Sequence, residues 1–320
     1  MSEPLVSVIV TTYNRSDVLR LAIGSALAQT FEDFEIVVVG DACTDDTAEV
    51  VAGLGDPRIR FTNLPENHGD QSGPSNAGLA MSRGRYIAYL NHDDLWWPDH
   101  LELTVAALAA GDANGVFTLL DSVHPDGGGD LHGACPEGLY HPLALAPASS
   151  WLLRRRLVQE LGGWRPSGRL YNIPSQDLLF RAWKSGKRLR LVPVLTVLAC
   201  HSGHRPGVYL RPDGEVAFWA ERLATDPEGL RAERLTRLAT AATLRLEQPG
   251  ALTAFKQLLR VWGKRFAALV GVHWISLGKF VRHGRRGGHL AALRRLRGLP
   301  PRRRGPGPGA SASGESRDEE

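Results

Sequence analysis

Residues 86–100 of the chain read YIAYLNHDDLWWPDH. The first five are an apolar run typical of a buried strand, and the run stops at an amide, an imidazole and two carboxylates. Ligands bind outside the carboxyl ends of the strands in an open α/β sheet. We therefore expect this stretch to mark both a central strand and a binding site.

Strands and helices are expected to alternate along the preceding residues. Apolar, β-branched runs predict strands at 5–12, 34–39, 58–63 and 85–90, and helical patterns predict helices at 14–29, from Thr44 onward, at 75–81 and at 98–109. Thr44 is expected to be the N-cap of its helix, and DGGGD (126–130) to form a loop. The alternation predicts an α/β fold with a mainly parallel sheet flanked by helices.

Charge and composition divide the chain into three regions. Residues 1–212 carry the α/β pattern, residues 213–298 are expected to form a basic, amphipathic helical extension, and residues 299–320 a disordered tail rich in Pro, Gly and Arg. The net charge is −7 over residues 1–250 and +11 over the rest, so the sequence pI of about 9.1 reflects the C-terminal part.

The cysteine content and the N-terminus indicate a compartment. The three cysteines are scattered, which argues against a disulfide framework and favours a reducing environment. No signal sequence is visible at the N-terminus, and the apolar run 266–277 is shorter than the roughly 20 residues that span a bilayer. We expect a cytoplasmic protein, either free or peripheral at the inner face of the membrane.

The residues after the strand at 85–90 suit a divalent cation. No G-x-G-x-x-G and no G-x-x-x-x-G-K-[ST] pattern is present, which disfavours a dehydrogenase and leaves phosphate charge to be neutralised in another way. Mn²⁺ and Mg²⁺ take carboxylate oxygens together with substrate phosphates. Asp93, with Asn91 or Asp94, fits this role. On an extended segment Asn91 and Asp93 would point to one side and His92 to the other.

Three segments resemble the inverting glycosyltransferases of family 2, which have a Rossmann-like GT-A fold. They are VSVIVTTYNR (6–15), FEIVVVGDACTDDT (34–47) and NHGDQSGPSNAGLAMSRGRYIAYLNHDDLWWPDHL (67–101). The resemblance covers about residues 5–205 and implies that residues 1–212 form the transferase domain. It implies transfer of a sugar from a UDP, dTDP or GDP donor to an unidentified acceptor hydroxyl, lipid-linked or on a glycan. The implied context is polysaccharide, cell-envelope or glycoconjugate synthesis, with Mn²⁺ or Mg²⁺ as cofactor.

The resemblance also implies roles for individual residues. Those expected to contact the donor are Thr12, Tyr13, Arg15, Asp41, Asn76, Asn91 and His92. Asp93 and His204 are the expected metal ligands. Asp177 is the expected general base, and Arg181, four residues later, lies on the same helical face.

The chain departs from the family pattern at three places. Gly40 stands where the family has the first of two acids, Asn91 replaces the first acid of the D-x-D motif, and Pro174 to Gln176 replace the usual Glu-Asp pair. These departures support an alternative, a non-catalytic nucleotide-sugar-binding or scaffold protein with a degenerate site.

Simpler structural roles compete at several positions. Asp93 and Asp94 could cap the helix expected near Trp97, and Asp177 could be a surface charge paired with Arg181. The two tryptophans, Trp96 and Trp97, are expected to pack in the core.

The C-terminal region permits two interpretations. Apolar residues including Trp262 and Phe266 recur every three or four positions, and Lys256, Arg260 and Lys264 repeat on another face. This pattern fits peripheral contact with an anionic membrane, and equally a helical cap on the catalytic domain. Nucleic acid is not an expected partner, because no stacking-aromatic or groove-reading motif is present.

Overall fold

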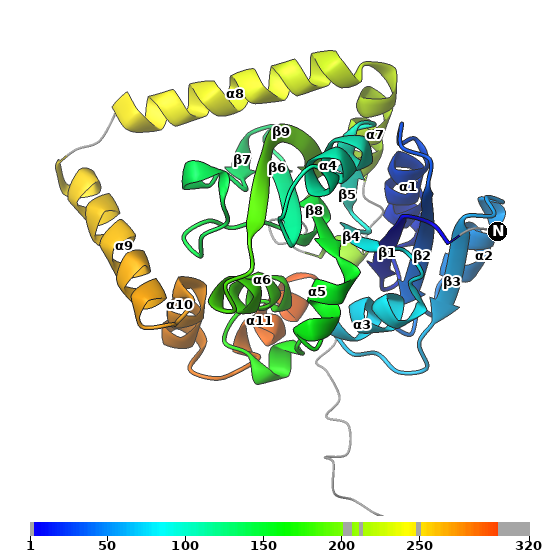
Figure 1. The fold of residues 1–320 in the computed structure, drawn as a ribbon, viewed down its shortest axis with the longest axis horizontal. Helices are drawn as coiled ribbons and strands as arrows, with labels where there is room; N and C mark the ends of the chain where they lie inside the picture. Colours follow the sequence, from blue (N-terminus) through cyan, green and yellow to red (C-terminus); the bar gives the residue numbers. More distant parts are fainter. Residues whose placement is uncertain (1–2, 201–206, 211–213, 248–250, 300–320) are drawn as a thin grey trace, which may run out of the picture.

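The computed structural model describes residues 3–200, 207–210, 214–247 and 251–299. A nine-stranded sheet forms the centre, with helices on both faces and a helical extension after the last strand (Figure 1). The strands are β1 (Val6–Thr12), β2 (Phe34–Gly40), β3 (Ile59–Asn63), β4 (Tyr86–Asn91), β5 (Asp94–Trp96), β6 (Gly115–Val123), β7 (Gly129–His132), β8 (Trp151–Arg154) and β9 (Leu189–Ala199). The helices are α1 (Ser16–Leu27), α2 (Thr47–Gly53), α3 (Ser72–Met81), α4 (His100–Ala109), α5 (Arg155–Glu160), α6 (Pro174–Lys184), α7 (Gly214–Thr225), α8 (Pro227–Glu247), α9 (Ala251–Leu269), α10 (Trp274–His283) and α11 (Gly288–Leu296).

The sheet contains the expected parallel strands and also antiparallel ones. Its order is β3-β2-β1-β4-β8-β6-β9-β5, with β7 paired to β6. The first four strands are parallel, as predicted, and β6 pairs with β9 in parallel. The pairs β4–β8, β6–β8, β6–β7 and β5–β9 are antiparallel. The α/β class and the run of parallel strands that ends at the expected site are confirmed.

Both faces of the sheet are covered by helices, because alternate residues of the central strands face opposite layers. Val8 and Val10 of β1 pack with α1 and α4 on one face. Ile9 of the same strand packs on the other face, where α5 and α6 contribute to the core. Trp96 and Trp97 are buried, so their expected place in the core is confirmed.

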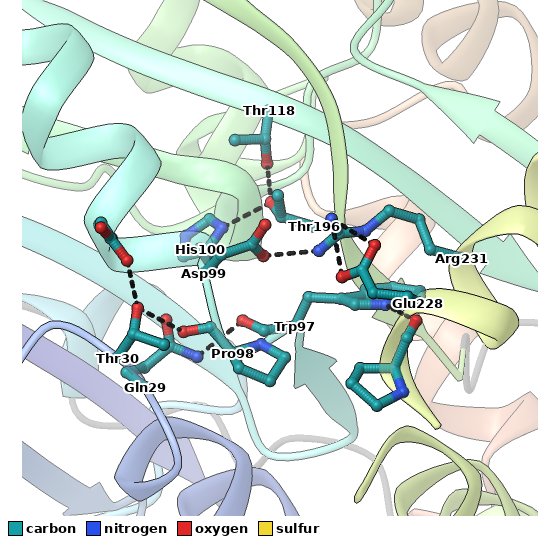
Figure 2. A network of polar contacts seen from close by, with 12 residues as sticks. Gln29, Thr30, Trp97, Pro98, Asp99, His100, Thr118, Thr196, Glu228 and Arg231 are labelled. Atoms are coloured by element: carbon teal, nitrogen blue, oxygen red, sulfur yellow. Dashed lines mark hydrogen bonds and ion pairs between the residues drawn. The ribbon is translucent and has the colours of Figure 1, made fainter. Parts of the chain in front are cut away.

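The helical extension is fastened to the α/β domain at the start of α8. The indole N–H of Trp97 donates to the carbonyl of Pro227 at 2.9 Å, and Arg231 donates to Asp99 at 2.6 Å (Figure 2). From there α8 and α9 pass around the outside of the domain and bring α10 and α11 back beside α6 (Figure 1). The extension therefore returns to the domain it leaves.

Several local expectations were wrong at element ends. Helix α2 begins at Thr47, and the Thr44 hydroxyl accepts a hydrogen bond from Asn14 Nδ2 at 3.2 Å, so Thr44 is not its N-cap. Gly129 and Asp130 belong to strand β7, so only the start of DGGGD is a loop. Helix α4 begins at His100, two residues later than expected.

Among the described residues, no helix combines the length and the apolar character that crossing a bilayer would require.

Candidate active site

A cavity of about 1620 Å³ opens at the carboxyl ends of β1, β2 and β4. The parallel strands end at one edge, so the polar residues that follow them come together. Six of the residues expected to bind donor or metal line this cavity: Thr12, Tyr13, Asp41, Asn91, His92 and Asp93. The sequence thus predicted the position of the cavity and most of its inner wall, which is formed by the residues at the carboxyl ends of β1, β2 and β4.

Asp41 is fixed by the loop that follows β3. Its carboxylate accepts hydrogen bonds from the backbone N–H groups of His68 and Gly69, at 2.8 and 3.0 Å, and the His68 ring lies 3.2 Å away. Burial raises the pKa of the Asp41 carboxyl, and the hydrogen bonds from His68 and Gly69 act in the opposite direction. The result is a carboxylate held rigidly at the cavity wall.

The segment Asn91 to Asp94 makes a turn between β4 and β5. All four of its residues line the cavity. The chain turns at His92 and Asp93, so the extended segment that was assumed in expecting His92 to point away from Asn91 and Asp93 is not formed. Asp94 lies in β5 and accepts hydrogen bonds from Asn91 Nδ2, at 2.8 Å, and from the Ser149 hydroxyl. It caps no helix, because Asp99 occupies the N-cap of α4.

Two neighbouring carboxylates on the cavity wall give this turn its electrostatic character. Burial, together with the negative charge of Asp93, raises the pKa of Asp94 to about 8. A divalent cation would relieve that repulsion, and carboxylate oxygens are the ligands that Mg²⁺ and Mn²⁺ prefer. The donor set therefore fits a divalent metal.

The metal would need ligands beyond the protein side chains. The described part of the chain contains no group of three His, Cys, Asp or Glu side chains placed to hold a metal ion. Mg²⁺ commonly binds through one or two carboxylates plus substrate phosphates, so two aspartates are sufficient. His204, the other expected ligand, lies outside the described residues.

Aromatic rings and an arginine surround His92. Its ring meets the Tyr209 ring edge to face, with centroids 6.3 Å apart, and Tyr13 lies 6.3 Å from the same tyrosine. The Arg15 guanidinium lies 5.4 Å from the Tyr209 ring centroid. Burial lowers the pKa of His92; the charge of Asp93 raises it, and the charges of Arg15 and Arg297 lower it. Arg15 is thus beside the cavity without lining it.

Asn76 does not line the cavity. Its amide bonds twice to the backbone of Trp164, with Nδ2 donating to the carbonyl at 2.9 Å and Oδ1 accepting from the N–H at 2.8 Å. This pair of bonds holds α3 against the loop after α5.

Asp177 is also absent from the cavity wall, although Ser175 and Gln176 belong to it. Its carboxylate accepts from Arg181 Nε at 2.8 Å, and Arg165 Nη1 lies 4.0 Å away. Arg181 also donates to the carbonyls of Leu161 and Gly163. The ion pair with Arg181 matches the pairing anticipated for Asp177, but Asp177 is buried and is not a surface charge.

Sequence reasoning missed the outer wall of the cavity. Lys279 of α10, Arg294 of α11 and Arg297, which follows α11, line it. The sequence signals were the basic residues themselves, which an isolated amphipathic helix would present to solvent or membrane. Only the return of α11 to the domain reveals their position.

The first part of the chain matches a family of known proteins. Residues 7–161 match the family model described as Glycosyl transferase family 2. The chain is 41% identical over 124 residues to the succinoglycan biosynthesis protein ExoO of Rhizobium meliloti, a match that covers 39% of this chain and 35% of ExoO. It is 35% identical over 127 residues to the chondroitin synthase of Pasteurella multocida, covering 39% of this chain and 13% of the synthase. The matched segment therefore spans about a third or less of these relatives.

Solved structures share the fold. The chain superimposes on S. aureus TarS (1–349) in complex with UDP-GlcNAc with a TM-score of 0.53 and 19% identity, over 73% of this chain and 70% of TarS. It superimposes on the mannosyltransferase PcManGT of Pyrobaculum calidifontis, in complex with GDP-Man and Mn²⁺, with a TM-score of 0.54 and 18% identity, over 88% and 87% of the two chains. The architecture is the GT-A fold. The match to glycosyl transferase family 2 covers residues 7–161, just under half of the chain.

Proposed function

We propose that the protein is a glycosyltransferase that moves a sugar from a nucleoside diphosphate to an acceptor hydroxyl with inversion. The observation that carries the proposal is the pair Asp93 and Asp94 at the end of β4, on one cavity with Asp41 and His92. Relatives named for succinoglycan biosynthesis and chondroitin synthesis support polysaccharide or cell-envelope synthesis as the context. Structural neighbours solved with UDP-GlcNAc and with GDP-Man support a sugar nucleotide as donor.

The cavity walls suggest how the donor is oriented. Thr12 ends β1, Tyr13 follows it, and Asp41 follows β2, so these residues would contact the nucleoside. Asn91 ends β4 and His92 follows it, next to the carboxylate pair, and both would contact the ribose and diphosphate. Arg15, whose guanidinium lies 5.4 Å from the Tyr209 ring centroid, would contribute positive charge near the donor. In this proposal residues 1–212 form the transferase domain and residues 213–298 its helical extension.

Asp93 and Asp94 would hold Mn²⁺ or Mg²⁺. The cation would neutralise the negative charge that builds on the diphosphate as it leaves the anomeric carbon. The protein's own part is to fix the two carboxylates: Asn91 and Ser149 hold Asp94 by hydrogen bonds. A base on the opposite side of the sugar would accept the proton of the acceptor hydroxyl.

The test is a panel of UDP-, dTDP- and GDP-sugars incubated with the protein, with and without Mn²⁺. We expect one donor to be consumed only with the cation, and Asp93→Ala to abolish its consumption. Asp112→Ala is the matched control, because Asp112 is an exposed carboxylate paired with Arg188. Full activity of the Asp93 variant would refute the assigned role.

A second candidate, a nucleotide-sugar-binding protein without turnover, is favoured by the geometry of Asp177. Its carboxylate is engaged by Arg181, and the cavity-lining residues just before it, Ser175 and Gln176, carry no acid. Calorimetry with the donor panel, followed by product analysis over several acceptors, separates the two. Binding without product would support the second candidate.

The surface of α9 and α10 supports a peripheral membrane contact at the inner face, near a lipid-linked acceptor. Large apolar side chains are exposed there, among them Trp262 (64%), Phe266 (66%) and Leu269 (85%). Arg265 and Arg282 are exposed on the same two helices. Apolar groups beside basic ones are typical of helices that lie in an anionic membrane surface.

Vesicle flotation tests this contact. The protein should float with vesicles that contain anionic lipid and less with purely zwitterionic ones, and Trp262→Glu combined with Phe266→Glu should abolish flotation. Equal flotation of the wild type and this double variant would contradict it. Leu131→Glu, an exposed apolar position on β7, is the control.

A further inference from the structure

The charges that line the cavity come from two separate parts of the chain. The lining carboxylates all lie in the first hundred residues: Asp41, Asp70, Asp93 and Asp94. The lining cations of the described residues all lie in α9, α10, α11 and the segments that follow α10 and α11: Lys264, Lys279, Arg282, Arg285, Arg294 and Arg297. The family-matched segment, residues 7–161, therefore supplies no lysine or arginine to the described cavity wall.

Helix α11 is fastened to three segments around the cavity. The N–H of Gly287 donates to the carbonyl of Leu170 at 3.0 Å, and the N–H of Gly207 donates to the carbonyl of Leu296 at 2.8 Å. Arg294 reaches the carbonyl of Gly69 at 3.4 Å, in the loop whose N–H groups hold Asp41. The position of the helix is thus tied to the loops of the active site.

Arg294 and Arg297 line the same cavity as the acidic turn of Asn91 to Asp94. Arg294 is buried, with 7% of its surface exposed. Burial and the charge of Asp93 raise the pKa of the Tyr209 hydroxyl, whereas Arg297, Arg15 and Arg294 act against that rise. The same tyrosine therefore lies within electrostatic reach of both arginines and of Asp93.

Arg297 has an unused donor. Its Nε–H is buried and makes no hydrogen bond to any described residue. A buried donor on a charged group is costly to leave unsatisfied, so this position suits an anionic acceptor. The guanidinium fork matches phosphate oxygens in shape as well as charge.

We propose that Arg294 and Arg297 bind the diphosphate of the donor, so that the C-terminal helix completes the donor site. This inference rests on the proposed function, because it names residues that act on the same ligand. It explains why a basic extension folds back over an acidic cavity: the extension supplies cations that the family-matched segment lacks there. The two arginines are donor-binding residues outside the family-matched segment.

The experiment measures binding of UDP, dTDP and GDP, each with Mn²⁺, by isothermal titration to the full-length protein. Uridine, thymidine and guanosine are titrated in parallel. For the diphosphate that the wild type binds, Arg294→Gln and Arg297→Gln should each weaken binding about 10- to 100-fold, the loss expected for a charged hydrogen bond. Binding of the matching nucleoside should change less than twofold.

Two controls protect the interpretation. Arg295→Gln removes an exposed charge from the same helix and should bind as the wild type does. Arg297→Lys keeps the charge and should lose less affinity than Arg297→Gln. Thermal melting of each variant reports whether it is folded.

The outcomes separate the two claims. Wild-type binding that neither Arg294→Gln nor Arg297→Gln weakens would overturn the assignment of the arginines and leave the proposed function intact. Equal weakening for nucleoside and diphosphate would overturn it as well, since the effect would then lie in the fold. A wild type that binds no nucleoside diphosphate would overturn both the assignment and the proposed function.

Discussion

Removing Arg234 should weaken the attachment of α8 to the α/β domain at a large cost in stability. Arg234 is 1% exposed and its partner Asp121 is fully buried, with Nε and Oδ2 2.5 Å apart. The other two guanidinium nitrogens donate to the carbonyls of Gly127 and Gly128, at 2.8 and 2.9 Å. Breaking a buried ion pair by removing one partner costs about 3–5 kcal/mol, because the remaining charge stays buried without compensation.

Urea unfolding of Arg234→Met, followed by tryptophan fluorescence, measures this cost. Trp219 is a suitable reporter, because the Arg234 guanidinium lies 5.2 Å from its ring centroid. With an m-value of roughly 3 kcal/mol per M, the midpoint should fall by about 1–1.7 M. Arg237→Met is the control: Arg237 is exposed and paired with Glu233 on the same helix, so its loss should cost less than about 1 kcal/mol.

A second substitution checks the cause. Asp121→Leu added to Arg234→Met should recover part of the loss, because no unpaired buried charge then remains. Equal midpoints for Arg234→Met and Arg237→Met would refute the reasoning. The reasoning would also be refuted if the double variant were less stable than Arg234→Met by roughly a further 3–5 kcal/mol.

Three other predictions follow from single residues. Burial lowers the pKa of His100 to about 3, so below pH 6.5 the unfolded chain takes up a proton that the folded protein does not. Its contribution to the free energy of unfolding should therefore fall by about 3 kcal/mol from pH 7 to pH 4, and His100→Gln should flatten this part of the urea-midpoint profile. Asp177→Asn should lower the melting temperature, because Arg181 loses the carboxylate it pairs with. If this variant keeps its turnover per folded molecule, Asp177 is not the base. A loss of turnover of about 100-fold with intact donor binding would establish Asp177 as the base. Gly287→Ala should destabilise the start of α11 by about 1–2 kcal/mol, because the φ of Gly287 is +70° and an added Cβ would lie 3.2 Å from Gly168 Cα. Diphosphate binding should weaken as well. An unchanged melting temperature and unchanged binding would contradict this prediction.

The first four strands and the inner cavity wall could be predicted because their signals are local. β1 consists mostly of buried, β-branched residues, and its polar end at Thr12 and Tyr13 follows directly in the sequence. The acidic turn after β4 is equally local. Parallel neighbours then bring these ends together without any further information.

The remaining features depend on distant partners. Strands β5, β7 and β8 have three or four residues each and exist through pairing with β9, β6 and β4. The roles of Asp94 and Ser149 depend on a contact between residues 55 positions apart. From the sequence alone, Arg294 and Arg297 fit a solvent-facing helix as well as a donor site. Only the path of the chain from α8 to α11 shows that they line the cavity.

The central claim is that Asp93 binds a divalent cation together with the diphosphate of the donor. Measuring how much Mn²⁺ is bound to the protein and how much is free in solution tests this claim most directly. Electron paramagnetic resonance can count bound Mn²⁺ in the presence of UDP, dTDP or GDP, for the wild type, for Asp93→Asn and for the control Asp112→Asn. The account predicts that one of these diphosphates makes the wild type and the control bind one cation per chain, and that Asp93→Asn loses it. Bound Mn²⁺ that Asp93→Asn leaves unchanged, or no bound Mn²⁺ with any of the three diphosphates, would contradict it.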